Sequence, residues 1–291
     1  MKITNNKNLP LPYVRAAQPF DPPAPHVCRV SSLLRPPQIN MLEREHWDEI
    51  ETDVMDRLWA MDGSASHYIL EQAGLVEDGY FIEEKLHAQI GAWSVRGRAD
   101  LITPEGTVID YKKTSVFTVK GMLQEMRPDY VKQLNYYAEL IRQMRANGAV
   151  LPEPKELLIT AESRDWRPGE NRQQQDYPNR VEVIPVEMWD EGKVMNLLIA
   201  DILEYEQASI GNARCCTAEE RWERPTKYAI MKPKAKRATK LYDDKQDAEQ
   251  QLLTYPEGTT IEVRKGAQVR CDDYCQVSSF CKQYLDLMME K

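Results

Sequence analysis

The sequence predicts an α/β fold, with a small mixed sheet flanked by helices and a C-terminal α+β appendage. Segments with apolar residues at helical spacing alternate with short strand-like segments bounded by turn residues. The 291 residues, 42% hydrophobic and 29% charged, are enough for one core with appendages. The composition changes after Cys216. We therefore expect an arm at residues 1–38, a core at 39–215 and the appendage at 216–291.

The N-terminal part of the chain is expected to be an arm followed by two helices. Residues 1–38 hold eight of the 18 prolines, which predicts an extended arm laid over the fold. Apolar residues from Gln38 to about Ala60 recur at helical spacing and predict a long amphipathic helix, broken at Gly63. A second helix should span about residues 64–72.

Strands and helices then alternate through the core. Three consecutive strands are expected at residues 80–89, 92–102 and 107–113, with Pro104-Glu105-Gly106 as the last turn. A strongly amphipathic helix should follow at 130–147. The remaining expected core elements are strands at 157–161 and 181–186, a polar loop between them, and a helix at 188–209. The appendage is expected to be β-β-α-β, at 227–231, 239–242, 244–253 and 260–263.

Charge and hydropathy restrict the function classes. No run of about 18 apolar residues occurs, and the N-terminus lacks the apolar stretch of a signal peptide, so we expect a cytoplasmic protein without membrane association. The net charge of -8 argues against nucleic acid, because phosphate binding requires positive potential. Residues 221–240, however, contain eight Lys or Arg and one Glu. The candidate DNA contacts there are Lys232, Lys234, Lys236 and Arg237; the alternative is a solvated loop.

Two acidic segments are the strongest chemical signal. Gly97-Arg98-Ala99-Asp100 and Val108-Ile109-Asp110-Tyr111-Lys112 lie on neighbouring expected strands joined by a tight turn. This arrangement brings Asp100 and Asp110 close together, and Lys112 projects from the same face as Asp110. Two carboxylates can hold Mg²⁺ or Mn²⁺, while the ammonium polarises water or neutralises phosphate charge. An isolated D-x-K is more often a salt bridge at a strand end, so the motifs around it decide whether it indicates a catalytic site.

Four motifs occur in order along the chain: G-x-x-x-H at 63–67, G-x-x-D at 97–100, D-x-K at 110–112 and Q-x-x-x-Y at 133–137. In this order they resemble the motifs of PD-(D/E)XK nucleases of the RecB-like branch. The resemblance implies a restriction-endonuclease-like core and metal-dependent hydrolysis of DNA phosphodiester bonds, typically from ends. By position it assigns metal binding to His67, Asp100, Asp110 and the Tyr111 carbonyl. Lys112 would be the catalytic lysine.

Three further residues are candidates for the same site. Gln133 and Tyr137 are four residues apart and share a helix face, so both can point at the strand ends. Gln133 could orient water or a metal-bound group, and Tyr137 could contact phosphate or stack on a base, with core packing as the alternative. Glu83 is a weaker candidate, because a carboxylate is common there in the family; the alternative is a solvated charge.

The C-terminal cysteines suggest a second metal site. Cys271, Cys275 and Cys281 resemble the C-terminal triplet of iron–sulfur RecB-like nucleases, although the first gap is three residues rather than two and Gln276 replaces a proline. Similarity to phage-encoded members favours Cys216 as the fourth ligand, with Cys215 and Cys28 as alternatives. Four thiolates could hold a [4Fe–4S] cluster or Zn²⁺, and unligated cysteines in a small core remain an alternative. Either metal would be structural.

The family resemblance leads to one functional hypothesis and two alternatives. The hypothesis is a Mg²⁺- or Mn²⁺-dependent exonuclease of phage or prophage origin that resects DNA ends for recombination or repair. A phage single-strand annealing protein is the candidate partner. The alternatives are an endonuclease or CRISPR-adaptation nuclease on the same scaffold, and a catalytically inactive DNA-binding module.

Overall fold

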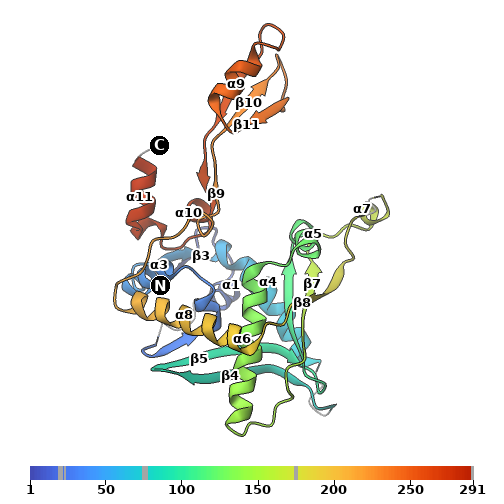
Figure 1. Ribbon diagram of the computed structural model, residues 1–291, viewed down its shortest axis with the longest axis vertical. Helices are drawn as coiled ribbons and strands as arrows, with labels where there is room; N and C mark the ends of the chain where they lie inside the picture. The colour runs from blue at the N-terminus through green and yellow to red at the C-terminus, as the bar shows by residue number, and fades with distance from the viewer. Residues whose placement is uncertain (19–21, 23, 74–77, 174–175, 290–291) are drawn as a thin grey trace. The chain divides into compact units, whose positions relative to one another are not determined.

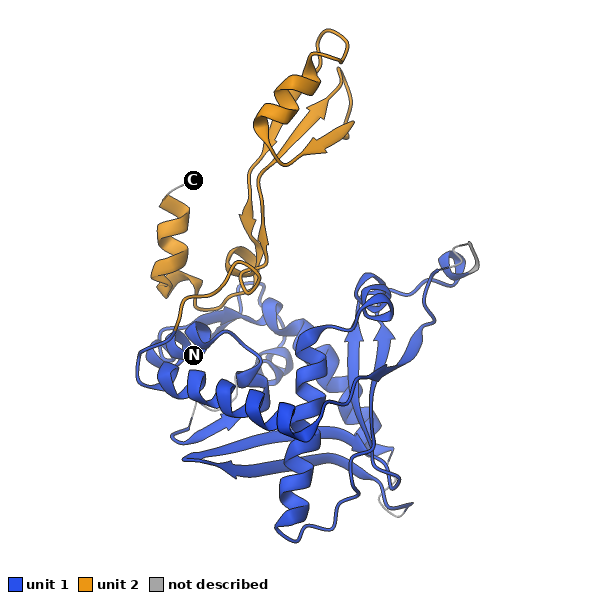
Figure 2. Cartoon of the chain, in the orientation of Figure 1, with its two compact units in different colours: residues 1–213 blue, residues 214–291 orange. Residues whose placement is uncertain are grey.

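The computed structural model describes residues 1–18, 22, 24–73, 78–173 and 176–289 (Figure 1). The chain divides into two compact units, unit 1 at Met1–Ala213 and unit 2 at Arg214–Lys291 (Figure 2). This division falls two residues before the boundary expected from composition. None of the helices in the described part of the chain is both long and apolar enough to cross a bilayer.

A six-stranded mixed sheet lies at the centre of unit 1. Its strands are β2 (Val27–Arg29), β4 (Phe81–Ile90), β5 (Trp93–Ile102), β6 (Thr107–Thr114), β7 (Glu156–Ser163) and β8 (Val181–Val186). The order is β2-β5-β6-β7-β8, with β4 also paired to β5. The β2–β5 and β6–β7 pairs are parallel and the others antiparallel. The predicted small mixed sheet is therefore confirmed.

Two strands, β2 and β6, pair with the same edge of β5, and the residues of β5 between them have no strand partner on that edge among the described residues. β2 pairs with residues 94–96 of β5, and β6 pairs only with Leu101 and Ile102. Within the described part of the chain, no strand pairs with residues 97–100 on this edge. The G-x-x-D segment therefore lies where β5 and β6 separate, which leaves room for side chains to enter the sheet.

The longer helices of unit 1 pack on this sheet or on one another, whereas α7 projects away from the sheet (Figure 1). The helices from residue 37 onward are α3 (Pro37–Glu45), α4 (Val54–Gln72), α5 (Val116–Gln124), α6 (Pro128–Ala146), α7 (Pro168–Gln173) and α8 (Glu191–Ser209). Of these, α5, α6 and α8 supply buried side chains to the core. α6 packs against β4, β5 and β6, while α8 packs against α3 and α6. Pro128 and Asp129 suit the first turn of α6, and residues 134–141 of this helix are all buried. The helix predicted at 130–147 is thus the central core helix.

The N-terminal part of the chain differs from the prediction. Residues 1–38 are not one extended arm, because they contain β1 (Lys2–Thr4), α1 (Leu11–Ala16), β2 and α2 (Val30–Leu33). Val30 and Leu33 are buried in the core, so this part of the segment belongs to the fold rather than covering it. Two of its prolines, Pro19 and Pro23, lie outside the described residues.

The predicted helix break at Gly63 is wrong. β3 (Glu51–Asp53) interrupts the expected first helix and pairs with β1, and α4 then runs unbroken through Gly63. Asp53 caps α4 and forms a capping box with Asp56. A glycine costs a helix only about 1 kcal/mol, which the cap and the packing of a 19-residue helix outweigh.

Unit 2 contains a small α+β module and the cysteine segment. Its elements are β9 (Glu223–Arg224), β10 (Lys227–Met231), β11 (Lys240–Tyr242), α9 (Lys245–Leu252), β12 (Thr260–Arg264), β13 (Ala267–Gln268), α10 (Val269–Asp273), a 3₁₀ turn (Ser278–Phe280) and α11 (Lys282–Met289). β10 lies between β11 and β12, and α9 packs on all three strands. The expected β-β-α-β appendage is present. Ala229, Ile230 and Ala248 form its small buried core.

Candidate active site

Two carboxylates lie opposite each other on neighbouring strands. The β4–β5 register pairs Ile82 with Leu101 and Glu84 with Ala99, which places Glu83 opposite Asp100. Both side chains are only 9% exposed. Like charges in directly opposed strand positions destabilise a sheet. Glu83 also has φ +50, a left-handed conformation that costs a non-glycine residue about 1–3 kcal/mol. The strained backbone and the two like charges coincide at one point, where His67 and Arg98 lie against the carboxylates.

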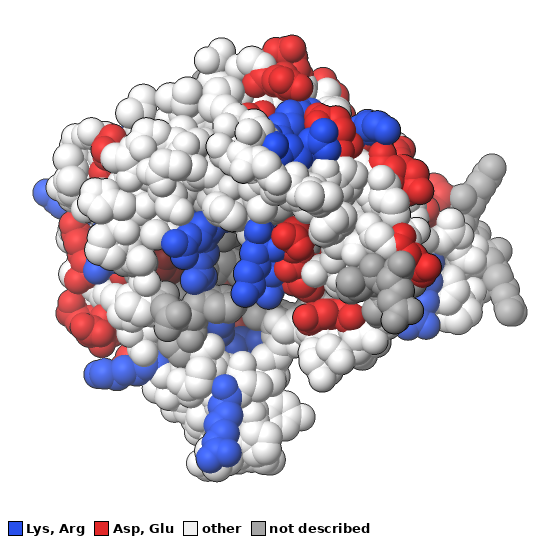
Figure 3. Space-filling model, turned by 90° about the horizontal axis from the view of Figure 1, so that it is seen from below, with Lys and Arg blue, Asp and Glu red and all other residues white. Residues whose placement is uncertain are grey.

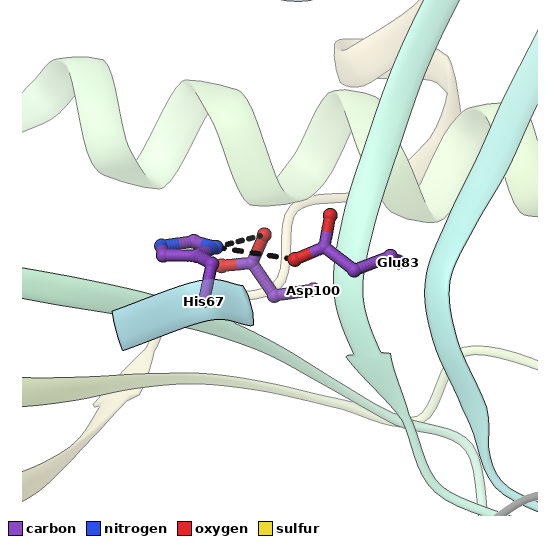
Figure 4. A group of neighbouring side chains, drawn as sticks. All are labelled: His67, Glu83 and Asp100. Carbon is purple, nitrogen blue, oxygen red and sulfur yellow. Dashed lines mark hydrogen bonds and ion pairs between the residues drawn. The ribbon is translucent and has the colours of Figure 1, made fainter. Parts of the chain in front are cut away.

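His67 on α4 completes this group. Its Nδ1 lies 3.2 Å from Glu83 Oε1 and 3.5 Å from Asp100 Oδ1 (Figure 4). The hydrogen bond with Asp100 is the main reason that the pKa of His67 rises to about 9. Ligand atoms of the three residues lie within 4.8 Å of one another, and no other such group of His, Cys, Asp or Glu occurs among the described residues. Mg²⁺ and Mn²⁺ favour carboxylate oxygens, so the donor set fits them.

Asp100 is held in place by the neighbouring strand. Its Oδ2 accepts a 2.7 Å hydrogen bond from the backbone N–H of Tyr111, across the point where β5 and β6 separate. The Tyr111 ring lies edge-on to His67, with 5.9 Å between the ring centroids. Asp100 therefore presents one oxygen to His67 while the other is fixed to the backbone of β6. The metal-ligand role of the Tyr111 carbonyl stays a prediction.

Asp110, Lys112 and Gln133 form a second group. Lys112 Nζ lies 2.7 Å from Asp110 Oδ2 and donates to Gln133 Oε1 at 3.1 Å, and Gln133 Nε2 donates to Asp110 Oδ1 at 3.1 Å. Burial raises the pKa of Asp110, and the Lys112 ammonium opposes that shift. Burial lowers the pKa of Lys112, but the attraction of Asp110 outweighs it, so the pKa is raised and the ammonium stays charged. Asp110 thus contacts the lysine rather than joining the His67 group.

Tyr137 connects two of the sequence motifs. Its hydroxyl accepts a 2.9 Å hydrogen bond from Gln133 Nε2, and its ring is only 6% exposed. Burial raises its pKa to about 12. A Cβ at Gly97 would lie 2.8 Å from Tyr137 Cε1, so the glycine of G-x-x-D makes room for this ring. The ring is too buried in this structure to stack on a base, which favours core packing, the alternative given for Tyr137. Contact of its hydroxyl with phosphate stays a prediction.

Lys113 was missed by the sequence analysis. Its Nζ donates to Asp62 Oδ1 at 3.1 Å and to Ser66 Oγ at 3.2 Å. These bonds tie α4 to β6 directly beside His67, so they fix where the histidine lies. In the sequence, the only feature that could have indicated its role is that it directly follows Lys112.

Arg98 was also missed, although it lies two residues before Asp100 on the same strand. Its Nε is 2.8 Å from Glu83 Oε2, and its side chain is 63% exposed. Together with His67, this guanidinium balances the negative charge of the carboxylate pair.

Tyr130 contacts the catalytic-lysine candidate. Lys112 Nζ lies 4.9 Å from the centre of the Tyr130 ring, and Arg127 Cζ lies 4.8 Å from it. Tyr130 is three residues before Gln133, so helical spacing alone could have indicated that both face β6.

The structure groups Cys216 with the C-terminal triplet in unit 2. Burial, with smaller effects from Glu220 and the thiols of Cys281, Cys271 and Cys275, raises the pKa of Cys216 to about 12. Gln283 on α11 holds the backbone of Cys216 through two hydrogen bonds, of 3.0 Å and 2.8 Å.

The two alternative fourth ligands lie in other surroundings. Cys28 is 1% exposed in the core of unit 1, where burial raises its pKa to about 12, and Cys215 is exposed. All six cysteines are in the described part of the chain, and none forms a disulfide.

The four basic candidates lie in the loop between β10 and β11. Lys232, Lys234, Lys236 and Arg237 are all exposed, and no ion pair within the described residues involves them. Their charges are thus available to an external anion. Positive charge also gathers elsewhere despite the net negative charge: on the face in Figure 3, Lys and Arg side chains border a central hollow, with Asp and Glu side chains beside them and toward the edge.

The chain is similar to known proteins in sequence and in structure. A family model described as the PD-(D/E)XK nuclease superfamily matches residues 34–282, most of the chain. The crystal structure of SSO0001 is similar at 17% identity and TM-score 0.43, over 62% of this chain and 77% of that one. An alkaline exonuclease from Laribacter hongkongensis, LHK-Exo, is similar at 14% identity and TM-score 0.35, over 64% and 91%. The structure of LHK-Exo in complex with dAMP is similar at 14% identity and TM-score 0.31, over 62% of this chain and 93% of that one. No curated protein matches the sequence.

Proposed function

Because this chain belongs to the PD-(D/E)XK nuclease superfamily, we propose that it is a metal-dependent deoxyribonuclease that degrades DNA from its ends. The observation that carries the proposal is the meeting of His67, Glu83 and Asp100 within 4.8 Å, close to a buried Lys112–Asp110 ion pair. A cation site beside a fixed ammonium is the arrangement that phosphodiester hydrolysis requires.

His67, Glu83 and Asp100 would hold Mg²⁺ or Mn²⁺, and the family resemblance adds Asp110 and the Tyr111 carbonyl. When bound, such an ion supplies positive charge that lowers the pKa of water and stabilises charge on the phosphate. The hydrogen bond from Tyr111 N–H keeps Asp100 oriented for binding.

Lys112 would supply a second positive charge to the scissile phosphate. Its ammonium is kept protonated by Asp110 and is oriented by Gln133, whose amide binds both partners. Tyr137 fixes the Gln133 amide in turn. The side chains around Lys112 Nζ are therefore in place before substrate arrives, so little reorganisation accompanies charge development in the transition state.

Cleavage from ends and membership of the RecB-like branch are supported by the order of the four sequence motifs. The same resemblance supports a phage or prophage protein that acts in a bacterial cytoplasm during recombination or repair. A phage single-strand annealing protein would be its partner in that setting.

For the cysteine segment we propose a [4Fe–4S] cluster held by Cys216, Cys271, Cys275 and Cys281. The mutual influence of these thiols on their pKa values supports their nearness. The resemblance of Cys271, Cys275 and Cys281 to the C-terminal triplet of iron–sulfur RecB-like nucleases favours this cluster over Zn²⁺. Visible absorption at about 400 nm in the freshly purified protein would support an iron–sulfur cluster. A colourless protein that contains zinc would contradict the proposal.

The experiment for the main proposal compares one DNA sequence as a linear duplex, a linear single strand and a covalently closed circle, each with Mg²⁺. We expect both linear forms to shorten and the closed circle to survive. Nicking of the closed circle would show an endonuclease instead. Binding of DNA without any cleavage would show the inactive binding module. Lys112→Met provides a matched protein that should shorten the linear forms about 10²- to 10³-fold more slowly than the wild type.

A further inference from the structure

An exposed tryptophan lies on the helix that carries the histidine of the candidate site. Trp59 is 65% exposed on α4, eight residues before His67. The Arg164 guanidinium lies 4.1 Å from the centre of the Trp59 ring. The cation covers one face of the indole, while most of the side chain stays in water. An exposed large aromatic side chain held by an arginine is a frequent binding element.

The structure links this tryptophan to the catalytic strand. Trp59, Asp62 and Ser66 are spaced i, i+3 and i+7, so they share one face of α4. Asp62 and Ser66 bind Lys113, the residue after Lys112 on β6. The same face of α4 therefore carries the contact to the end of β6 and the contact to Arg164.

Arg164 follows β7, the parallel neighbour of β6. Thr114 pairs with Ser163, and the backbone N–H of Arg164 donates to the Thr114 carbonyl at 2.8 Å. Neighbouring strands lie about 4.8 Å apart, so the Trp59–Arg164 pair is at the strand end next to the one that carries Lys112.

A second exposed aromatic side chain lies on α5, which begins two residues after the end of β6. Phe117 is 86% exposed in the first turn of α5. The preceding residue, Val116, donates its N–H to Asp165 Oδ1 at 2.7 Å. The Arg164-Asp165 dipeptide thus holds Trp59 through the arginine and the start of α5 through the aspartate. Trp59 thus contacts the residue that follows β7, and Phe117 lies in the helix that follows β6.

We propose that Trp59, Arg164 and Phe117 form a base-stacking platform beside the active site and that the strand reaching this site is single-stranded DNA. The inference rests on the proposed nuclease function. Unpaired bases offer an aromatic face to tryptophan and phenylalanine, whatever the sequence, and the arginine adds a positive charge near the phosphates. A duplex keeps its bases stacked inside and offers mainly phosphates. Tyr137, the aromatic residue expected to stack on a base, is buried and cannot.

The nearby acidic side chains do not oppose an anionic strand strongly. Asp62 is paired with Lys113, and Asp165 accepts from the backbone of α5. Arg164 is exposed and its guanidinium lies on the indole. Both carboxylates therefore have a hydrogen-bonding partner, and the Arg164 guanidinium adds a positive charge beside the indole.

The test measures binding of a labelled oligonucleotide, single-stranded and as a duplex of the same sequence, by fluorescence anisotropy with Ca²⁺ in place of Mg²⁺. We compare the wild type with Trp59→Ala, Phe117→Ala and Leu123→Ala. Leu123 is an exposed apolar residue on α5 as well, at 48%, and serves as the control. We expect the wild type to prefer the single strand. Trp59→Ala and Phe117→Ala should each weaken that binding by about fivefold to a hundredfold, with less than a twofold change for the duplex. Leu123→Ala should bind both as the wild type does.

Equal weakening for single strand and duplex would overturn the single-strand assignment, and unchanged binding would overturn the platform. Because the replaced side chains are largely exposed, we expect all three variants to fold, and thermal unfolding of each variant checks this. A parallel cleavage assay with Mg²⁺ separates the two proposals. A wild type that cleaves DNA while both aromatic variants bind normally refutes only the platform. A wild type that cleaves no DNA refutes the nuclease proposal.

Discussion

Replacing Gly97 by alanine tests whether contacts made by α6 fix the active site. A Cβ at this position would lie 2.8 Å from Cε1 and 3.0 Å from Cδ1 of Tyr137, and 3.3 Å from Cδ1 of Leu140. Tyr137 is 6% exposed and Leu140 is fully buried. Neither side chain can move into solvent, so α6 or β5 has to shift.

The expected effect follows from that overlap. Overpacking a well-packed core costs about 1–3 kcal/mol, and about 2–4 °C in Tm accompanies each kcal/mol in a domain of this size. A displaced Tyr137 also moves its hydroxyl away from Gln133 Nε2, now 2.9 Å away. Gln133 orients both Asp110 and Lys112, so we expect Gly97→Ala to lower the cleavage rate about tenfold to a hundredfold.

Thermal unfolding and initial cleavage rates measure the two effects. Gly121→Ala is the matched control, because Gly121 lies inside α5 with nothing within 4 Å of an added Cβ. It should raise stability by about 0.5–1 kcal/mol and leave cleavage unchanged. If Gly97→Ala is as stable and as active as the wild type, the ring of Tyr137 does not hold the site as we infer.

Three further predictions address the charges of the site and the basic loop. Glu83→Gln should weaken Mn²⁺ binding at least about tenfold in titration calorimetry, because it removes one of two opposed carboxylates; unchanged affinity would exclude Glu83 as a ligand. Lys112→Met should lower kcat about 10²- to 10³-fold in single-turnover assays and change DNA affinity little, because its charge acts mainly in the transition state; equal loss of affinity would make it a binding residue. Replacing Lys234 and Lys236 by alanine should reduce the slope of log K against log salt by about 2 for duplex DNA. An unchanged slope would mean that the loop does not contact phosphate.

The sequence motifs predicted most of the residues that the structure brings together in the candidate site, because two of the motif residues are close in sequence. Asp110 and Lys112 are two residues apart on one strand, and the structure pairs them at 2.7 Å. Asp100 and His67 could also be located, each by its own motif. Glu83 ranked lower because its importance arises from its position opposite Asp100 and from its left-handed backbone. Neither property is visible in a strand-like pattern.

Long-range packing explains what the sequence could not predict. β2 pairs in parallel with β5, whose paired residues come 67 positions later, and nothing in a proline-rich segment indicates such a partner. This pairing leaves residues 97–100 open on one edge of β5, where Asp100 reaches the backbone of β6. The Gln133–Tyr137 spacing correctly gave a shared helix face. The burial of that face, however, depends on Gly97 of β5, which leaves room for the Tyr137 ring.

Cleavage of end-labelled linear DNA by the wild type and by Asp100→Asn tests the central claim most directly. Asparagine retains an oxygen that can accept the Tyr111 N–H, so the variant should keep the wild-type Tm while losing a charged metal ligand. We predict that the wild type releases labelled fragments with Mg²⁺ or Mn²⁺ and none with EDTA, and that Asp100→Asn releases none under any of these conditions. Cleavage in EDTA, or cleavage by Asp100→Asn at the wild-type rate, would contradict a metal-dependent nuclease site at His67, Glu83 and Asp100.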